Sequence, residues 1–304
     1  MKKVKYIIIM LIFILLLSGC EKINEDIEIN LKVSKGSDVV LNIMTTDKLL
    51  YFMTKDIVGD KHFVDFMFKN REEELNYVFS QDAINNISKY DLFIYNGGGL
   101  EPWASDFVNK LSKGKLGIIN LSRGINILSY SDNVKHKKYI FKENPYYWMN
   151  IDNYKIALLN IKNSIQDKDP KNREFYEKNF ENTVKELEEY EKKIKELSAN
   201  LKETEVYYSE EDLEYFLKYS NIKGIKIPKD KELAEEIKDD NINKNRLFFY
   251  SNGNELKKVE EDIKKYNMVP INILIHKENA RYIDIVKYNV NSLNKAVLSN
   301  GGNQ

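Results

Sequence analysis

Short apolar runs alternate with amphipathic segments over residues 39–120, which indicates an α/β lobe. The runs that we expect to be strands are Val39–Met44, Phe63–Phe68, Asp91–Asn96 and Leu116–Asn120. The segments that we expect to be helices are Lys48–Ile57, Ala83–Ser88 and Asp106–Lys113, the first of them ending at Gly59 as a C-cap. Because strands that alternate with helices pair in parallel, these elements predict a parallel sheet with helices on both faces.

A different pattern follows from Asp169-Pro170 to about Lys202, a stretch without Gly or further Pro. Apolar residues recur there every three, four or seven positions, with Glu and Lys between them: Phe180, Val184, Leu187, Ile194, Leu197 and Leu201. This spacing predicts one long amphipathic helix. A coiled coil would give the same spacing, but the stretch is too short for several sustained heptads. We therefore favour a connecting helix that packs along two lobes.

The α/β alternation then resumes up to residue 298. Expected strands are Val206–Tyr208, Ile222–Ile227, Arg246–Ser251 and Ile271–Ile275. Expected helices are Glu210–Tyr219, Lys231–Ile237, Asn254–Tyr266 and Arg281–Leu298. The fold class is therefore α/β, with two lobes, each a mainly parallel sheet with covering helices, joined by one long connecting helix. We expect the boundaries at 38–165 for the first lobe, 166–202 for the helix, 203–298 for the second lobe and 299–304 for a tail.

The N-terminal segment has the features of a bacterial lipoprotein signal. A basic region with Lys2, Lys3 and Lys5 precedes an apolar run that is too short to span a bilayer, Tyr6–Leu17. Leu17-Ser18-Gly19-Cys20 then matches a lipobox, and Cys20 is the only cysteine of the chain. We expect a signal peptide over 1–19, a diacylglycerol on Cys20 and a polar tether over 20–37, which would anchor the protein to the extracytoplasmic face of the cell membrane. An ordinary signal peptide with an incidental cysteine is the weaker alternative.

Composition excludes several functional classes. A single cysteine excludes an internal disulfide, a thiolate zinc site and a cysteine nucleophile in the mature domain. Removal of residues 1–19 would leave 44 basic residues against the 47 acidic ones, so nucleic acid is not an expected partner. The chain also lacks Gly-x-Ser-x-Gly, His-Glu-x-x-His and Walker-type motifs, and the Gly97–Gly99 run lacks the Lys-Ser/Thr of a phosphate loop. We expect no enzymatic activity.

One segment, Asp91–Trp103, reads Asp-Leu-Phe-Ile-Tyr-Asn-Gly-Gly-Gly-Leu-Glu-Pro-Trp. It resembles the signature DLFVYNGLGLEPW of the metal-binding, solute-binding lipoproteins of zinc and manganese ABC importers. Further blocks that resemble this family are Ile118–Ile125, Asn144–Trp148, Ser209-Glu210 with Tyr215-Phe216, and Tyr282 through Tyr288-Asn289. The resemblance implies an ABC permease as partner, attachment to the membrane through the N-terminal lipid, and a metal or small solute bound between two lobes.

The family's four ligand positions fall on Leu75, Tyr146, Glu210 and His276. Leu75 has no donor atom, and a neutral tyrosine is a poor ligand for zinc or manganese. Glu210 agrees with the glutamate of manganese-type members, and His276 can still bind a metal. A one-residue shift of the first loop would bring in Glu74. The resemblance therefore implies either at most one divalent ion, Zn or Mn, in an altered site of Glu74, Tyr146, Glu210 and His276, or a site that has been lost.

The remaining histidines have simpler interpretations. The segment Ser131–Lys138 stands where zinc-type members carry a histidine-rich loop, and it has one histidine among three lysines. Such a loop would repel a cation, so we expect His136 to be exposed, and His62 likewise. For His276, a hydrogen-bonded surface residue is as good an interpretation as a ligand. Tyrosines near the expected cleft, such as Tyr77 and Tyr146, would suit an organic ligand, although packing between lobes explains most of them as well.

Two functions remain. The first is a solute-binding lipoprotein that delivers its solute to an ABC permease. The second is a surface interaction or adhesion lipoprotein on the same scaffold that no longer binds metal.

Overall fold

The computed structural model describes residues 39–111, 114–136, 138–238 and 244–301, and residues 40–304 form one compact unit. The expected signal peptide, Cys20 and the tether lie outside the described residues. Within the described part of the chain, no helix is long and apolar enough to span a membrane.

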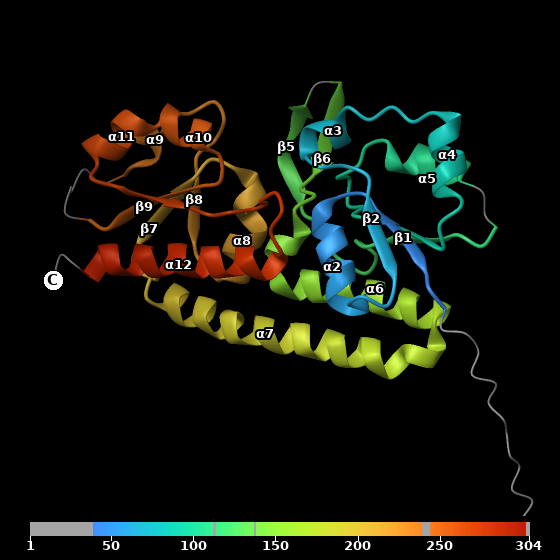
Figure 1. Ribbon diagram of the computed structural model, residues 1–304. Helices are drawn as coiled ribbons and strands as arrows, with labels where there is room; N and C mark the ends of the chain where they lie inside the picture. The colour runs from blue at the N-terminus through green and yellow to red at the C-terminus, as the bar shows by residue number, and fades with distance from the viewer. Residues whose placement is uncertain (1–38, 112–113, 137, 239–243, 302–304) are drawn as a thin grey trace, which may run out of the picture. The chain divides into compact units, whose positions relative to one another are not determined.

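The first lobe contains a parallel four-stranded sheet in the order β2-β1-β3-β4 (Figure 1). Its strands are β1 Asn42–Thr45, β2 Phe63–Phe66, β3 Leu92–Tyr95 and β4 Gly117–Asn120. Its helices are α2 Lys48–Val58, α3 Arg71–Leu75, α4 Gln81–Ile87, α5 Ala104–Lys110 and α6 Ile151–Lys168. Alternate residues of each strand face opposite sides of the sheet. Ile43 and Leu92 accordingly pack with α2 and α6, while Met44 and Phe93 pack with α4 and α5.

The second lobe repeats this architecture with the strand order β10-β9-β7-β8, again parallel. Its strands are β7 Glu205–Tyr208, β8 Gly224–Lys226, β9 Arg246–Tyr250 and β10 Val269–Asn272. Its helices are α8 Glu214–Tyr219, α9 Leu233–Glu236, α10 Gly253–Lys258, α11 Glu260–Lys265 and α12 Tyr282–Gly301. The two-lobed α/β class predicted from the sequence is confirmed. The expected helix 254–266 is two helices, which meet at Val259.

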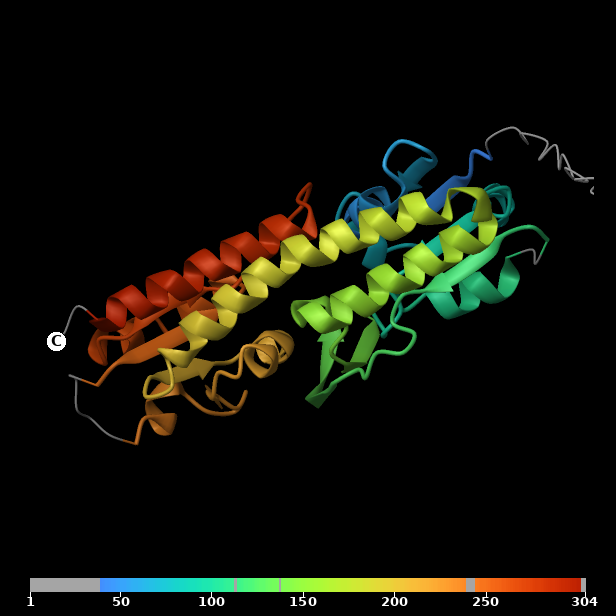
Figure 2. The same cartoon turned by 90° about the horizontal axis from the view of Figure 1, so that it is seen from below.

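The long helix α7, Arg173–Ala199, begins after a 3-10 turn at Pro170–Asn172 and confirms the predicted connecting helix. It packs on α2 and α6 of the first lobe and on α12 of the second (Figure 2). Leu187 and Ile194 on α7 belong to one hydrophobic cluster that also contains residues of both sheets. The connecting helix therefore shares a core with each lobe.

Besides the short helix α3, two parts of the first lobe were not expected. One is α6, which lies antiparallel to α7 across the turn at Pro170 (Figure 2). The other is an antiparallel hairpin of β5 Ser129–His136 and β6 Tyr139–Glu143, in the segment interpreted as a loop. The hairpin reaches the second lobe, where the Ser131 hydroxyl donates to Glu211 (2.7 Å) and the Tyr130 hydroxyl donates to Asp212 (2.6 Å).

His62 is buried, so the expectation that it is exposed was wrong. Its Nδ1 accepts a hydrogen bond from the Leu41 amide (3.3 Å), and its Nε2 lies 2.7 Å from the Tyr176 hydroxyl. That hydroxyl donates to Asp169 (2.5 Å). Asp169 follows α6 and Tyr176 lies near the start of α7, and together they cover the histidine, a long-range contact that the local sequence does not reveal. The side chain of His136 lies outside the described part of the structure.

Candidate solute-binding cleft

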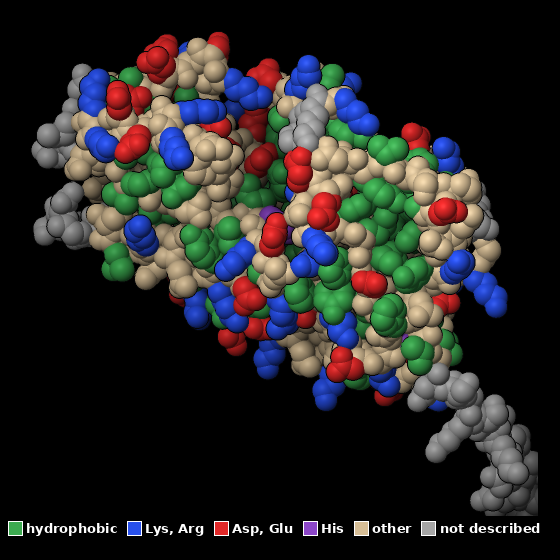
Figure 3. All heavy atoms as spheres, turned by 45° about the horizontal axis from the view of Figure 1, so that its top comes forward, with side chains coloured by type: hydrophobic (Ala, Val, Ile, Leu, Met, Phe, Trp, Pro, Cys, Tyr) green, Lys and Arg blue, Asp and Glu red, His purple; other side chains and the backbone are tan. Residues whose placement is uncertain are grey.

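A cleft of about 310 Å³ lies between the two lobes (Figure 3). Its walls come from segments that follow parallel strands: Asp47 after β1, Asn70 and Arg71 after β2, Glu210 after β7, and Asn252 after β9. In open α/β sheets, ligands bind at the carboxyl ends of the strands. The carboxyl ends of the strands in both parallel sheets lie at this cleft, so the cleft is the candidate site.

Four of the residues singled out from the sequence line this cleft, namely Glu74, Tyr146, Glu210 and His276. Leu75 does not line it. Its side chain is buried in the first lobe, because α3 turns Glu74 rather than Leu75 toward the cleft. The loop that the count along the sequence selects lines the cleft, and the helical turn decides which of its residues faces the cleft.

Arg71 also lines the cleft, although it is not among the residues expected there from the sequence. Its guanidinium Nη1 donates to Glu74 Oε2 (2.5 Å), and Nη2 donates to the Leu100 carbonyl (2.5 Å). Asn70 caps the start of α3 by accepting from the Glu73 amide (2.9 Å), which fixes Arg71 at the first position of the helix. A lone Arg after a strand carries no motif, so a local pattern does not reveal this contact.

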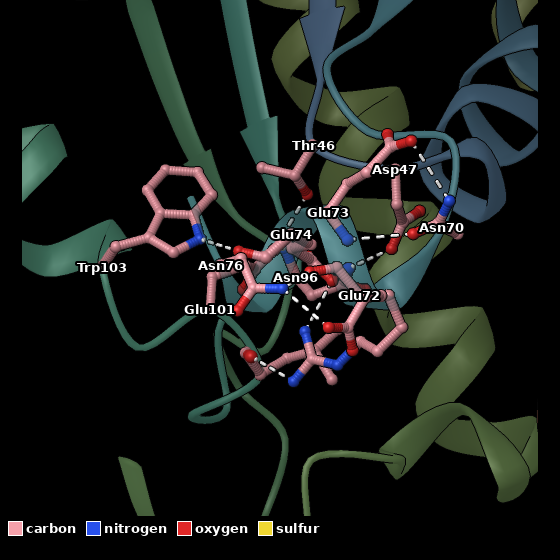
Figure 4. A network of polar contacts seen from close by, with 12 residues as sticks. Thr46, Asp47, Asn70, Glu72, Glu73, Glu74, Asn76, Asn96, Glu101 and Trp103 are labelled. Carbon is pink, nitrogen blue, oxygen red and sulfur yellow. Dashed lines mark hydrogen bonds and ion pairs between the residues drawn. The ribbon is translucent and has the colours of Figure 1, made fainter. Parts of the chain in front are cut away.

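Glu101 is a buried carboxylate near Glu74 (Figure 4). It accepts hydrogen bonds from the Thr46 hydroxyl (2.8 Å), the Asn96 amide (2.8 Å) and the Gly97 amide (2.9 Å). Burial raises the pKa of Glu101 to about 7, against the opposing effect of these donors. Burial, with the neighbouring Glu101 charge, also raises the pKa of Glu74 well above its usual value.

On the second lobe, Glu210 holds the loop after β9. Its carboxylate accepts from the Ser251 amide (2.7 Å), the Ser251 hydroxyl (2.6 Å) and the Asn252 amide (3.2 Å). Beside it, burial raises the pKa of Asp212 to about 6. His276 is partly buried and follows Ile275, whose carbonyl accepts from the Trp148 indole of the first lobe (3.0 Å).

The carboxylates of Glu74 and Glu210 are engaged with protein groups rather than gathered into a ready metal site. Among the described residues, no three His, Cys, Asp or Glu side chains converge in a way that could hold a metal ion. Burial raises the pKa of Tyr146 to about 12, so its phenol is neutral at pH 7 and a weak ligand. Glu74 is paired with Arg71. A metal ion would have to replace some of these contacts.

A cleft at the carboxyl ends of two parallel sheets, with a long helix shared by both lobes, defines a two-lobed binding protein. The family model described as "zinc-uptake complex component A periplasmic" matches residues 43–296, so the chain belongs to this family. Members of this family are substrate-binding proteins of ABC importers and not enzymes.

The chain is 31% identical over 151 residues to the manganese ABC transporter substrate-binding lipoprotein PsaA of Streptococcus pneumoniae, covering 48% of this chain and 47% of that protein. It is 30% identical over 153 residues to the high-affinity zinc uptake system protein ZnuA of Bacillus subtilis, covering 48% and 47%. The chain thus matches about half the length of these curated relatives. The expectation of at most one zinc or manganese ion agrees with the ions named for them.

Solved structures show the same fold. The metal-dependent lipoprotein YcdH of Bacillus subtilis superposes with a TM-score of 0.69 at 22% identity, over 84% of this chain and 99% of that one. The Zn(II)-bound ZnuA-like domain of Streptococcus pneumoniae AdcA gives a TM-score of 0.66 at 20% identity, over 85% and 99%.

Proposed function

We propose that this chain is the extracytoplasmic solute-binding lipoprotein of a metal-type ABC importer and that it takes its solute into the cleft between the lobes. Family membership supports the importer assignment. The observation that carries the cleft assignment is that Glu74, Tyr146, Glu210 and His276 line one cavity, although they come from four separate segments of the chain. A lipid on Cys20 would hold the protein at the membrane, next to its permease.

In this proposal the solute site is altered rather than ready-made. Glu74 and His276 would supply a carboxylate and an imidazole from opposite lobes, and Glu210 a second carboxylate, which are donors that suit Zn or Mn. Tyr146 would contribute a neutral oxygen. Because the donors come from both lobes, an ion bound to them would favour the arrangement in which the lobes lie close together.

Direct contacts between the lobes define their arrangement before an ion binds. Asp56 of α2 pairs with Arg281 (2.8 Å), and the Tyr282 hydroxyl donates to the Trp148 carbonyl (2.6 Å). Asp56, Arg281 and Tyr282 do not line the cleft, and these contacts hold the lobes together without a solute. The permease would then recognise the difference between the cleft surfaces of the solute-free and solute-bound arrangements of the lobes. A solute shifts the protein between these arrangements only to the extent that it binds one of them more tightly.

The proposal predicts a loss of metal uptake in cells that lack this chain. Cellular zinc and manganese, measured by elemental mass spectrometry under metal limitation, should fall and should return when the wild-type chain is supplied. Cys20→Ser should fail to restore uptake, because the chain would lose its anchor. Glu196→Gln, on the exposed face of α7, is the matched control and should restore uptake.

Equal metal content with and without the chain would reject transport. It would favour the second candidate, a surface interaction or adhesion lipoprotein on the same scaffold. The observation that favours this candidate is the Arg71–Glu74 pair, which engages one of the expected donors inside the cleft.

A further inference from the structure

Arg71 places a permanent positive charge among the donor oxygens of the cleft. Its guanidinium contacts Glu74 and the Leu100 carbonyl, which belong to two different segments of the first lobe. Glu74 is one of the donors that the altered metal site requires. The same carboxylate oxygen cannot pair with the guanidinium and coordinate a metal ion in the same geometry.

We infer that Arg71 is an internal competitor of the metal ion, which binds in the cleft only after the guanidinium has left Glu74. This inference rests on the proposed function, since it names the residue that sets the metal affinity of that site. Arg71 would stabilise the cleft without an ion and would lower its affinity for one.

The position of Glu74 supports this role. Its side chain is 2% exposed, and its Oε1 has no hydrogen-bond partner in the described part of the chain, whereas Oε2 is paired with Arg71. A buried carboxylate with an unpaired oxygen is costly unless a cation lies beside it. Arg71 supplies that cation now, and a divalent ion could supply it instead.

The position of Arg71 shows how the exchange can occur. Its side chain is 28% exposed, so the guanidinium has access to solvent from the cleft. It stands at the first position of α3, and rotation of its side chain would leave the Asn70 cap of that helix intact. Lys69 and Lys48 also line the cleft and add to the repulsion that an entering cation meets. The Lys48 ammonium is held by Asn279 of the second lobe, which keeps it at the rim.

Removal of the guanidinium should therefore raise the metal affinity. Isothermal titration of the full-length chain in detergent with zinc chloride, and separately with manganese chloride, compares the wild type with Arg71→Met. We expect one ion per chain and at least a tenfold lower Kd in the variant. Arg71→Gln keeps a donor for the Leu100 carbonyl but removes the charge, and it should show the same gain if Arg71→Met fails to fold.

Two controls separate this effect from a general change in charge. Arg123→Met removes an arginine that is exposed and does not line the cleft, and it should bind metal as the wild type does. Arg71→Met combined with Glu74→Gln should lose the gain, because the Glu74 carboxylate for which Arg71 and the metal ion compete is gone. An unchanged or higher Kd in both Arg71 variants, with native near-UV circular dichroism, would overturn the inference.

The outcome is independent of the uptake experiment. Tighter metal binding by Arg71→Met together with unchanged cellular metal would reject the importer function and keep the role of Arg71. Metal uptake that depends on the chain, together with an unchanged Kd in the Arg71 variants, would do the reverse.

Discussion

At the residue scale, Glu101 explains how a segment without any ligand position can shape the site. It accepts from Thr46 at the end of β1 and from the amides of Asn96 and Gly97 after β3. Two residues later, the Trp103 indole donates to the Glu74 carbonyl (3.0 Å). The block around Gly97 therefore fixes the loop after β2 through its side chains, and with it the residues that face the cleft.

His62 is the second buried ionisable group whose role is testable. Burial lowers the pKa of His62, and the nearby Asp169 charge offsets this lowering only in part. The folded state therefore favours the neutral ring. The unfolded chain binds a proton below its ordinary pKa of about 6.5. The unfolded state then binds more protons than the folded state, and this residue's contribution to the stability falls as the pH falls through that range.

We expect His62→Asn to lose about 1–3 kcal/mol at pH 7.5, because Tyr176 and the Leu41 amide lose a buried partner. Between pH 7.5 and 5.5 the wild type should lose more stability than the variant, since only the wild type has this proton uptake on unfolding. Urea unfolding at both pH values measures the difference. Other groups, such as Asp56, titrate in both proteins, so identical pH slopes would contradict the assignment.

At the scale of elements, the sequence predicts those whose pattern is local. The spacing of apolar residues and the Gly59 cap predict α2 over its observed length, and the connecting helix and the last helix follow from the same kind of pattern. The hairpin β5–β6 was missed because Ser131–Lys138 is polar on both faces. Its pairing depends on contacts with the second lobe, such as Ser131 with Glu211, and a local pattern does not contain them.

The loop from Asn96 to Glu101 provides a test at this scale. Gly97 has φ of +69°, and an added Cβ would lie 2.0 Å from Asn120 Oδ1 and 2.7 Å from Ser122 Oγ. Gly97→Ala should therefore destabilise the protein by more than the roughly 1–2 kcal/mol that a positive φ alone costs. Thermal unfolding should show a clear fall in Tm.

Gly253→Ala is the matched control for this substitution. Gly253 opens α10, and nothing lies within 4 Å of an added Cβ. We expect a change of less than about 0.5 kcal/mol there. Equal Tm values for Gly97→Ala and the wild type would show that the loop relaxes without cost and that it does not fix the cleft.

At the scale of the whole described unit, the two lobes share one hydrophobic cluster through α6, α7 and α12. The two-lobed class could be predicted because each lobe has its own alternation of strands and helices. The segments of the site could be predicted from the family resemblance. The contacts inside it could not, because Arg71 reaches the Leu100 carbonyl across 29 residues of chain, and the sequence around neither residue records the other.

The account's central claim is that Arg71 and a metal ion exclude each other in the cleft. Anomalous difference maps at the zinc edge, from zinc-soaked crystals of the wild type and of Arg71→Met, test it most directly. The variant should show one peak at about 2.0–2.2 Å from a Glu74 oxygen, and the wild type should show that peak only where the guanidinium has left Glu74. A zinc peak beside Glu74 with the Arg71–Glu74 pair intact would contradict the claim.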